Sequence, residues 1–332
     1  MNKQFLLAAR PVGFPKESDF RLVETPVPPL KDGEFLVRIL WLSLDPYMRG
    51  RMSDAPSYAP PVQLGEVMTG GAAGVVEESK HPNYQTGDFV TGNFGWQQFA
   101  VSDGRGTMKV DPSLAPLSAY LGVLGMTGAT AYFGLLDIGQ LKNGESVVVS
   151  GAAGAVGSIA GQIAKIKGCP VVGIAGDAAK IHYVVNVLGF DASFNYKTEA
   201  DYSQRIGELC PQGVDVYFDN VGGAITDAVF AHINKHARIV VCGQISQYNL
   251  EKPDVGPRLL VQLIKKQARA EGFLVYQFAS RYKEAITDIA QWLKDGKIKY
   301  CEQVAEGIES APAAFIGMLK GANTGKQLVR IA

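Results

Sequence analysis

The sequence is poor in cysteine, the residue that builds disulfide frameworks. Only four cysteines occur among 332 residues, and no two of them form a C-x-x-C pair. They are Cys169, Cys210, Cys242 and Cys301. Scattered single cysteines are typical of free buried thiols in a reducing compartment, so we expect no disulfide framework.

Histidine is equally scarce, with four residues, which limits the metal sites that the chain can build. The one pair at the i, i+4 spacing of a helix is His232 with His236. A zinc site needs about three protein ligands, and no third ligand follows at a matching spacing. We therefore interpret this pair as part of a polar helix surface.

Excess charge and long apolar runs are also absent. Lys plus Arg and Asp plus Glu each number 32, so no basic surplus favours a nucleic acid as partner. No apolar run approaches the roughly 18 residues of a membrane helix, and the start, MNKQFLLAARPVGFP, has too short an apolar stretch for a secretory signal. We expect a cytoplasmic protein that contacts no membrane.

The hydrophobic pattern predicts two domains, in agreement with a prior of roughly 150 residues per domain. Up to Leu117 the chain shows short strand-like runs between turn residues, which indicates mostly β structure. From Ser146 onward, strands alternate with helix-length segments, which is typical of an α/β fold with a doubly wound parallel sheet. The expected strands are 147–149, 171–175, 192–196, 214–220, 238–243 and 269–276.

The stretch SVVVSGAAGAVG, from Ser146 to Gly157, lies where the first of these strands meets the first helix. Glycines let the backbone approach a pyrophosphate, whose charge the helix N-terminus stabilises. The spacing G-x-x-G-x-x-G is not the common G-x-G-x-x-G, so a glycine-rich turn without a ligand is the alternative. The position in the sheet favours a dinucleotide site. Its expected contacts are Gly151, Gly154, Ala155, Val156 and Gly157.

The end of the second strand bears on which dinucleotide binds. NAD-binding sites place an acidic residue there to accept from the ribose hydroxyls. Here Gly176 leaves room for a 2′-phosphate, and Lys180 follows one turn later to supply its counter-charge. This favours NADP, with the alternative that Asp177 is the ribose acid and Lys180 a solvated lysine.

Several longer segments carry a resemblance that covers essentially the whole chain. They are SLDPYMRGRMSD (43–54), LGVLGMTGATAYFGLLDIG (121–139), FDNVGG (218–223), CGQISQYN (242–249) and FIGMLKGANTGKQLV (315–329). The chain resembles the zinc-independent medium-chain dehydrogenase/reductases, within them the leukotriene hydroxydehydrogenase and prostaglandin reductase family, and especially the bacterial NADPH-dependent curcumin reductases. This implies a Rossmann domain (123–296) inserted in a mostly β, GroES-like substrate domain (1–122 and 297–332).

The resemblance implies roles for individual residues. Lys180 and Tyr196 are implied to hold the 2′-phosphate of NADPH, and Asn323 to reach the nicotinamide region. The other implied cofactor contacts are Thr127, Gly176, Asn220, Val221, Cys242, Gly243, Phe273, Leu274 and Val275.

For the substrate, the resemblance points to the segment that contains Tyr47 and Met48, while Tyr58 and Tyr276 are weaker candidates for the pocket wall. The alternative is that the segment is structural, with Arg49 or Arg51 paired to a nearby acid.

Zinc is not expected as a cofactor. Where zinc-dependent relatives carry G-H-E, this chain reads Leu64, Gly65, Glu66, and no cysteine precedes Cys169. The phosphate motif also departs from the family pattern, because Gly151 stands where alanine is usual. That change should preserve the turn.

Without a metal, the implied reaction is NADPH-dependent reduction of the C=C bond of an enone or alkenal, with curcumin as a further candidate substrate. Hydride transfer to the β-carbon places negative charge on a distant oxygen, which hydrogen-bond donors stabilise. Tyr248 and the cofactor ribose are the candidate donors, and the alternative for Tyr248 is a loop tyrosine that only packs.

Other functions stay open at this point. An NADP-dependent quinone reductase or alcohol dehydrogenase fits the same fold, and a non-catalytic NADPH-binding protein is a further alternative. We also expect a homodimer, paired through the edge strand at 272–276.

Overall fold

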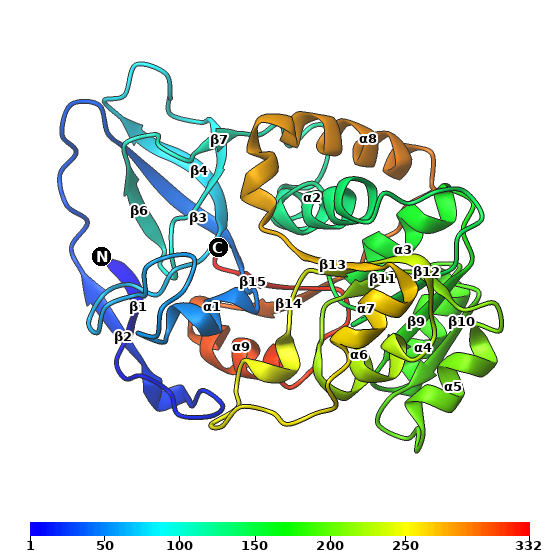
Figure 1. Cartoon of the computed structure of the whole chain (residues 1–332). Helices are drawn as coiled ribbons and strands as arrows, with labels where there is room; N and C mark the ends of the chain where they lie inside the picture. Colours follow the sequence, from blue (N-terminus) through cyan, green and yellow to red (C-terminus); the bar gives the residue numbers. More distant parts are fainter. The chain divides into compact units, whose positions relative to one another are not determined.

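The computed structural model describes all residues from 1 to 332. The chain folds into two compact units, whose helices and strands are labelled in Figure 1. Unit 1 comprises Met1–Gly122 and Glu302–Ala332, and unit 2 comprises Val123–Cys301. Unit 2 is thus an insertion in the chain of unit 1. None of the helices combines the length and the apolar character that a membrane crossing requires.

Unit 1 consists mainly of β structure. Its larger sheet has the strand order β14-β15-β3-β4-β5-β7, with β6 paired to β3, and β1 and β2 form a separate antiparallel pair. The strands are β1 (Asn2–Leu7), β2 (Phe20–Thr25), β3 (Phe35–Ser43), β4 (Ala72–Ser79), β5 (Phe89–Gly92), β6 (Phe99–Ser102), β7 (Met108–Lys109), β14 (Glu302–Glu306) and β15 (Lys326–Arg330). The α-helices are α1 (Tyr47–Arg51) and α9 (Ala311–Leu319).

Unit 2 is built on a six-stranded parallel sheet with the order β10-β9-β8-β11-β12-β13. Its strands are β8 (Val147–Ser150), β9 (Val171–Ala175), β10 (Ala192–Asn195), β11 (Val214–Asp219), β12 (Ile233–Val241) and β13 (Arg269–Gly272). In order of sequence this is 3-2-1-4-5-6, the arrangement of a dinucleotide-binding fold. The predicted doubly wound sheet is confirmed.

Helices cover both faces of this sheet (Figure 1). They are α2 (Met126–Phe133), α3 (Gly157–Ile166), α4 (Ala178–His182), α5 (Tyr202–Leu209), α6 (Gly223–Phe230), α7 (Leu260–Lys266) and α8 (Tyr282–Lys294). Residues of α5, α6 and α7 pack with one face of the strands in a single apolar cluster, whereas α3 packs on β8, β9 and α2. Strands buried on both faces explain the apolar runs of the sequence.

Two predictions about local structure were wrong. The sixth strand ends at Gly272 rather than Tyr276, because the chain turns at Phe273 into a 3-10 helix over Val275–Arg281. His232 and His236 do not share a helix. The helix α6 ends at Phe230, and His236 lies inside β12 with a left-handed backbone, φ 65°, where the pairing with β11 shifts register.

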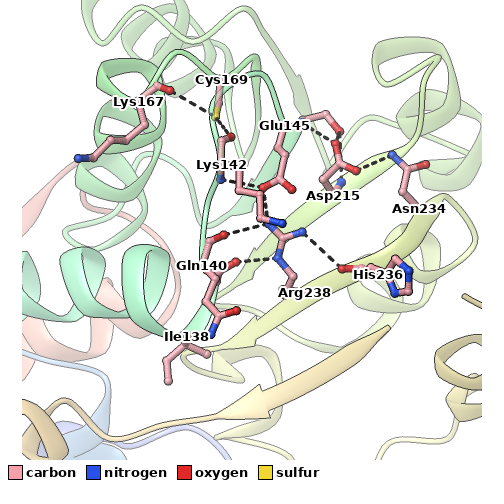
Figure 2. Close-up of polar contacts among 12 residues, drawn as sticks. Ile138, Gln140, Lys142, Glu145, Lys167, Cys169, Asp215, Asn234, His236 and Arg238 are labelled. Atoms are coloured by element: carbon pink, nitrogen blue, oxygen red, sulfur yellow. Dashed lines mark hydrogen bonds and ion pairs between the residues drawn. The ribbon is translucent and has the colours of Figure 1, made fainter. Parts of the chain in front are cut away.

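A polar brace lies near the amino ends of the central strands (Figure 2). The guanidinium of Arg238 on β12 forms an ion pair with Glu145 and donates to Gly139 O at 2.7 Å and Gln140 O at 3.3 Å. Next to it, Asp215 on β11 accepts from Ser146 N at 2.9 Å. These contacts fasten the loop before β8 at the end of the sheet opposite to the glycine turn.

Candidate active site

The glycine turn connects β8 to α3 with the backbone drawn tightly together. Gly151 has a left-handed backbone, φ 61°, and Gly154 N donates to Gly151 O at 2.9 Å. A Cβ atom added at Gly157 would lie 2.4 Å from Gly151 O, so only glycine fits there. The helix begins at Gly157 without a side-chain cap. A helix start of this kind offers backbone N–H groups and the positive end of the helix dipole to a phosphate.

A basic cluster, formed by Lys180 and Lys197, lies near Gly176 at the end of β9. A Cβ atom there would lie 3.0 Å from Tyr196 Cε1 and 3.2 Å from Lys197 Cε, so glycine lets these two side chains come close to the backbone. Lys180 follows in α4 with only 8% of its surface exposed. Burial lowers the pKa of Lys180, and the charge of Lys197 lowers it further, while Asp177 opposes both. The ammonium groups of Lys180 and Lys197 near this strand end provide charge for a phosphate.

Asp177 contributes to this region mainly as a helix cap. One of its carboxylate oxygens accepts from Lys180 N at 2.8 Å, and the other lies 3.7 Å from Lys180 Nζ. A carboxylate engaged in capping is not positioned primarily for a ribose. Lys197 was missed at the level of sequence, although it directly follows Tyr196, and only the fold brings it to Gly176.

The ends of β11 and β12 meet next to the glycine turn. Asn220 Nδ2 donates to Ser150 O at 2.7 Å, and a Cβ atom at Gly151 would lie 3.4 Å from Asn220 Cβ and 3.6 Å from Val221 Cγ2. On the neighbouring strand end, Cys242 N donates to Asp219 O at 2.9 Å. Burial raises the pKa of the Cys242 thiol to about 12, so this group is neutral at physiological pH.

Tyr248 lies over these strand ends. Its hydroxyl oxygen accepts from Gln244 N at 3.2 Å, and a Cβ atom at Gly243 would lie 3.3 Å from it. A phenol oxygen that accepts from a backbone amide becomes a stronger donor through its own proton. The structure therefore brings the candidate donor to the same edge of the sheet as Asn220 and the glycine turn.

Thr127 provides a test of whether a cofactor fits in unit 2. Its Oγ1 atom, in the first turn of α2, is buried and has no hydrogen-bond partner in the chain. Buried polar groups are almost always paired, so this hydroxyl requires a polar group from outside the chain. The unpaired hydroxyl of Thr127, the glycine turn and the basic cluster together fit a phosphorylated dinucleotide bound to unit 2.

The segment after β13 shows a mixed pattern. Phe273 and Val275 are buried, while Leu274 and Tyr276 are exposed at 37% and 61%. In unit 1, Asn323 Nδ2 donates to Gly325 O at 2.9 Å, which fixes the side chain within its own turn. These residues stay assigned by resemblance.

The segment of unit 1 that was predicted to contact the substrate contains the short helix α1. Met48 is fully buried, Tyr47 is half-buried and Tyr58 is 55% exposed. The complete burial of Met48 favours the structural alternative for this residue.

Two buried arginines of α1 hold the adjacent loops. Arg49 donates to Gly13 O at 2.9 Å, and burial lowers its pKa against the opposing charge of Asp19. Arg51 donates to Ser57 Oγ at 2.7 Å and lies 4.6 Å from the ring centre of Tyr58. Backbone carbonyls and a hydroxyl as acceptors are partners that charge patterns in a sequence do not reveal.

Nowhere in the chain do three or more His, Cys, Asp or Glu side chains come together in a group that could hold a metal ion. Glu66, in the segment that replaces G-H-E, instead accepts from Gln63 N at 3.0 Å within its own turn.

Comparison with known proteins places both units in families of oxidoreductases. A family model described as the N-terminal domain of oxidoreductase matches residues 3–110, and one described as zinc-binding dehydrogenase matches residues 155–291.

Individual relatives match the chain over nearly its full length. The NADPH-dependent curcumin reductase of Escherichia coli is 47% identical, over 100% of this chain and 97% of that protein. Prostaglandin reductase 1 of Rattus norvegicus is 46% identical, over 96% of this chain and 95% of that protein. The crystal structure of CurA from Vibrio vulnificus in complex with NADPH has a TM-score of 0.95 at 46% identity and covers 99% of each chain.

Proposed function

The chain belongs to the zinc-independent medium-chain dehydrogenase/reductases, in the family of the curcumin and prostaglandin reductases, and we infer its reaction from this membership together with the geometry of unit 2. It is an NADPH-dependent reductase of the C=C bond of α,β-unsaturated carbonyl compounds. The observation that carries the choice of cofactor is the basic cluster of Lys180 and Lys197 around Gly176.

Different residues of unit 2 are assigned to different parts of NADPH. We assign the pyrophosphate to the glycine turn, with Gly151, Gly154 and Gly157 allowing close approach and Ala155 and Val156 contributing backbone amides. We assign the 2′-phosphate to Lys180, Tyr196 and Lys197 around Gly176. When bound, the cofactor supplies the hydride.

The nicotinamide end is assigned to the ends of β11 and β12 and to the segment after β13. The assigned residues are Thr127, Asn220, Val221, Cys242, Gly243, Phe273, Leu274, Val275 and, from unit 1, Asn323. The unpaired hydroxyl of Thr127 supports this assignment, because a carboxamide would satisfy it.

Tyr248 is assigned the role of donor to the enolate oxygen. The hydrogen bond from Gln244 N to its hydroxyl oxygen orients the phenol and increases its strength as a donor. Negative charge that develops on the carbonyl oxygen during reduction is stabilised by a donor already in place. For the substrate we retain Tyr47, with Tyr58 and Tyr276 as weaker candidates, whereas the fully buried Met48 is assigned to packing.

We divide these roles between the two units. Unit 2 is the NADPH-binding domain and unit 1 the substrate domain, in keeping with the glycine turn in the former and α1 in the latter. We also propose a cytoplasmic location, which the absence of disulfides among four free cysteines supports.

A homodimer is part of the proposal. The strand β13 is an edge of its sheet, all four of its residues are exposed, and the neighbouring α7 exposes Leu260 at 74% and Ile264 at 79%. An unpaired strand edge beside exposed apolar side chains is typical of a surface that a second copy covers.

The proposal is tested with a panel of enones, alkenals and curcumin-like diketones, each assayed with NADPH and with NADH. We expect turnover of the conjugated carbonyls with a strong preference for NADPH. A preference for NADH would overturn the phosphate assignment, and faster turnover of a quinone than of every enone would favour the quinone reductase.

A further inference from the structure

Asp219, the last residue of β11, carries a fully buried carboxylate. It accepts hydrogen bonds from three hydroxyls, one side-chain amide and two backbone amides. The donors are Ser150 Oγ (3.0 Å), Tyr217 OH (2.8 Å), Thr226 Oγ1 (2.7 Å), Gln244 Nε2 (2.8 Å), Val221 N (3.0 Å) and Gly222 N (2.9 Å).

None of these six donors has a net charge, and no ion pair of the chain includes Asp219. All six hydrogen bonds end on carboxylate oxygens, and none of the donors brings a compensating positive charge. The charge of the carboxylate acts on its surroundings. After burial, the charge of Asp219 is the next cause that raises the pKa of both Tyr217 and Cys242.

The carboxylate is linked through one residue to Tyr248, the proposed donor. Gln244 connects the two, since its Nε2 donates to Asp219 Oδ2 and its backbone N donates to the hydroxyl oxygen of Tyr248. The backbone oxygen of Asp219 also accepts from Cys242 N at 2.9 Å and Gly243 N at 3.0 Å. Asp219 therefore fastens together the two strand ends assigned to the nicotinamide.

We propose that Asp219 is an electrostatic positioning residue that favours the cationic nicotinamide of NADP+ over the neutral ring of NADPH, and so makes the bound cofactor a stronger hydride donor. This inference rests on the proposed function. In the reaction, the electron pair of a cofactor C–H bond moves with its hydrogen to the β-carbon. The enone would become an enolate, which takes one proton from water at its α-carbon, while the cofactor is oxidised and its ring gains one positive charge. A fixed negative charge in a dry site stabilises that gain.

The test is the ratio of the dissociation constants of NADP+ and NADPH, measured by titration of the full chain. Asp219→Asn removes the charge with little change of shape, and we expect the ratio Kd(NADP+)/Kd(NADPH) to rise about tenfold, equivalent to about 30 mV for a two-electron couple. The Kd of 2′,5′-ADP, which lacks the nicotinamide, should stay within about twofold, since a charge effect confined to the ring leaves the phosphate contacts intact.

A second variant works in the opposite direction and does not depend on the folding of the first. Thr226→Val removes one donor but keeps the charge, so the field at the nicotinamide becomes more negative and the ratio should fall about threefold. The inference is overturned if the ratio Kd(NADP+)/Kd(NADPH) of Thr226→Val stays at the wild-type value. It is also overturned if the Kd of NADP+ and the Kd of NADPH change by the same factor in a folded Asp219→Asn.

Failure of the proposed function is distinguishable from these results. If the wild-type chain binds NADPH and NADP+ but reduces no enone, the proposed reaction is wrong while the predicted ratios still decide the role of Asp219. If the wild-type chain binds neither form, both proposals are wrong.

Discussion

Replacing Lys180 with methionine removes a buried ammonium group from the cluster around Gly176 while keeping a side chain of similar length. Lys180 is 8% exposed, so solvent screens its charge only weakly. A hydrogen bond to a charged group contributes roughly 1.5–3 kcal/mol. Because Lys197 and Tyr196 stay in place, we expect a loss of about 2 kcal/mol, which weakens NADPH binding about 30-fold.

The assay is fluorescence titration with NADPH and with NADH, which lacks the 2′-phosphate. In Lys180→Met the Kd of NADPH should rise about 30-fold while that of NADH changes less than about twofold. Lys197→Met, at an exposed position, should cost only about threefold. Lys165→Met is the matched control, because Lys165 pairs with Asp191 away from the cluster and its loss should leave both affinities unchanged. Equal weakening of NADPH and NADH would refute the assignment.

The pH dependence of binding follows from the same geometry. Burial lowers the pKa of Lys180 below its ordinary 10.5, and only the protonated form attracts the phosphate. NADPH affinity should therefore fall as the pH rises through this lowered pKa, earlier than for an exposed lysine, whereas NADH affinity should not. An identical alkaline profile in wild type and Lys180→Met would contradict the argument.

Tyr248→Phe should lower kcat on an enone by about 10- to 100-fold with the Kd of NADPH unchanged, because it removes one donor to the developing oxyanion; unchanged turnover would remove Tyr248 from the mechanism. Arg238→Met should lower the free energy of unfolding by about 2–4 kcal/mol in urea titrations, since the half-buried Glu145 carboxylate loses its ion-pair partner. A loss below about 0.5 kcal/mol would show that the brace adds no stability. Ile264→Glu should convert a dimer into a monomer in light scattering, and a dimer of unchanged mass would place the interface elsewhere.

The doubly wound sheet was predictable because its central strands are buried on both faces. Such strands appear as continuous apolar runs, and Val147–Val149 is the clearest. The edge strand β13 was predicted to continue to Tyr276, beyond its end at Gly272, for the converse reason. Its residues RAEG are all exposed, so the apolar pattern directed the prediction to the buried residues that follow, such as Phe273 and Val275.

The candidate site was predictable only where residues follow a recognisable strand end. Gly176 and Lys180 met this condition, and Lys197 did not, because its proximity depends on how β9 and β10 pair. The six donors around Asp219 likewise come from separate segments, and no spacing in the sequence indicates that they converge. The structural alternative for α1 had Arg49 or Arg51 paired with an acid, and the observed partners of Arg51 include Ser57 Oγ and backbone carbonyls instead.

The central claim, reduction of a conjugated C=C bond, is tested most directly by the position of a transferred label. A simple enone is incubated with the protein and with NADPH that carries deuterium at the transferring carbon, and the product is analysed by NMR and mass spectrometry. We predict a saturated ketone with one deuterium on the β-carbon and the carbonyl group intact. Deuterium on the carbonyl carbon of an allylic alcohol would contradict this account and identify an alcohol dehydrogenase instead.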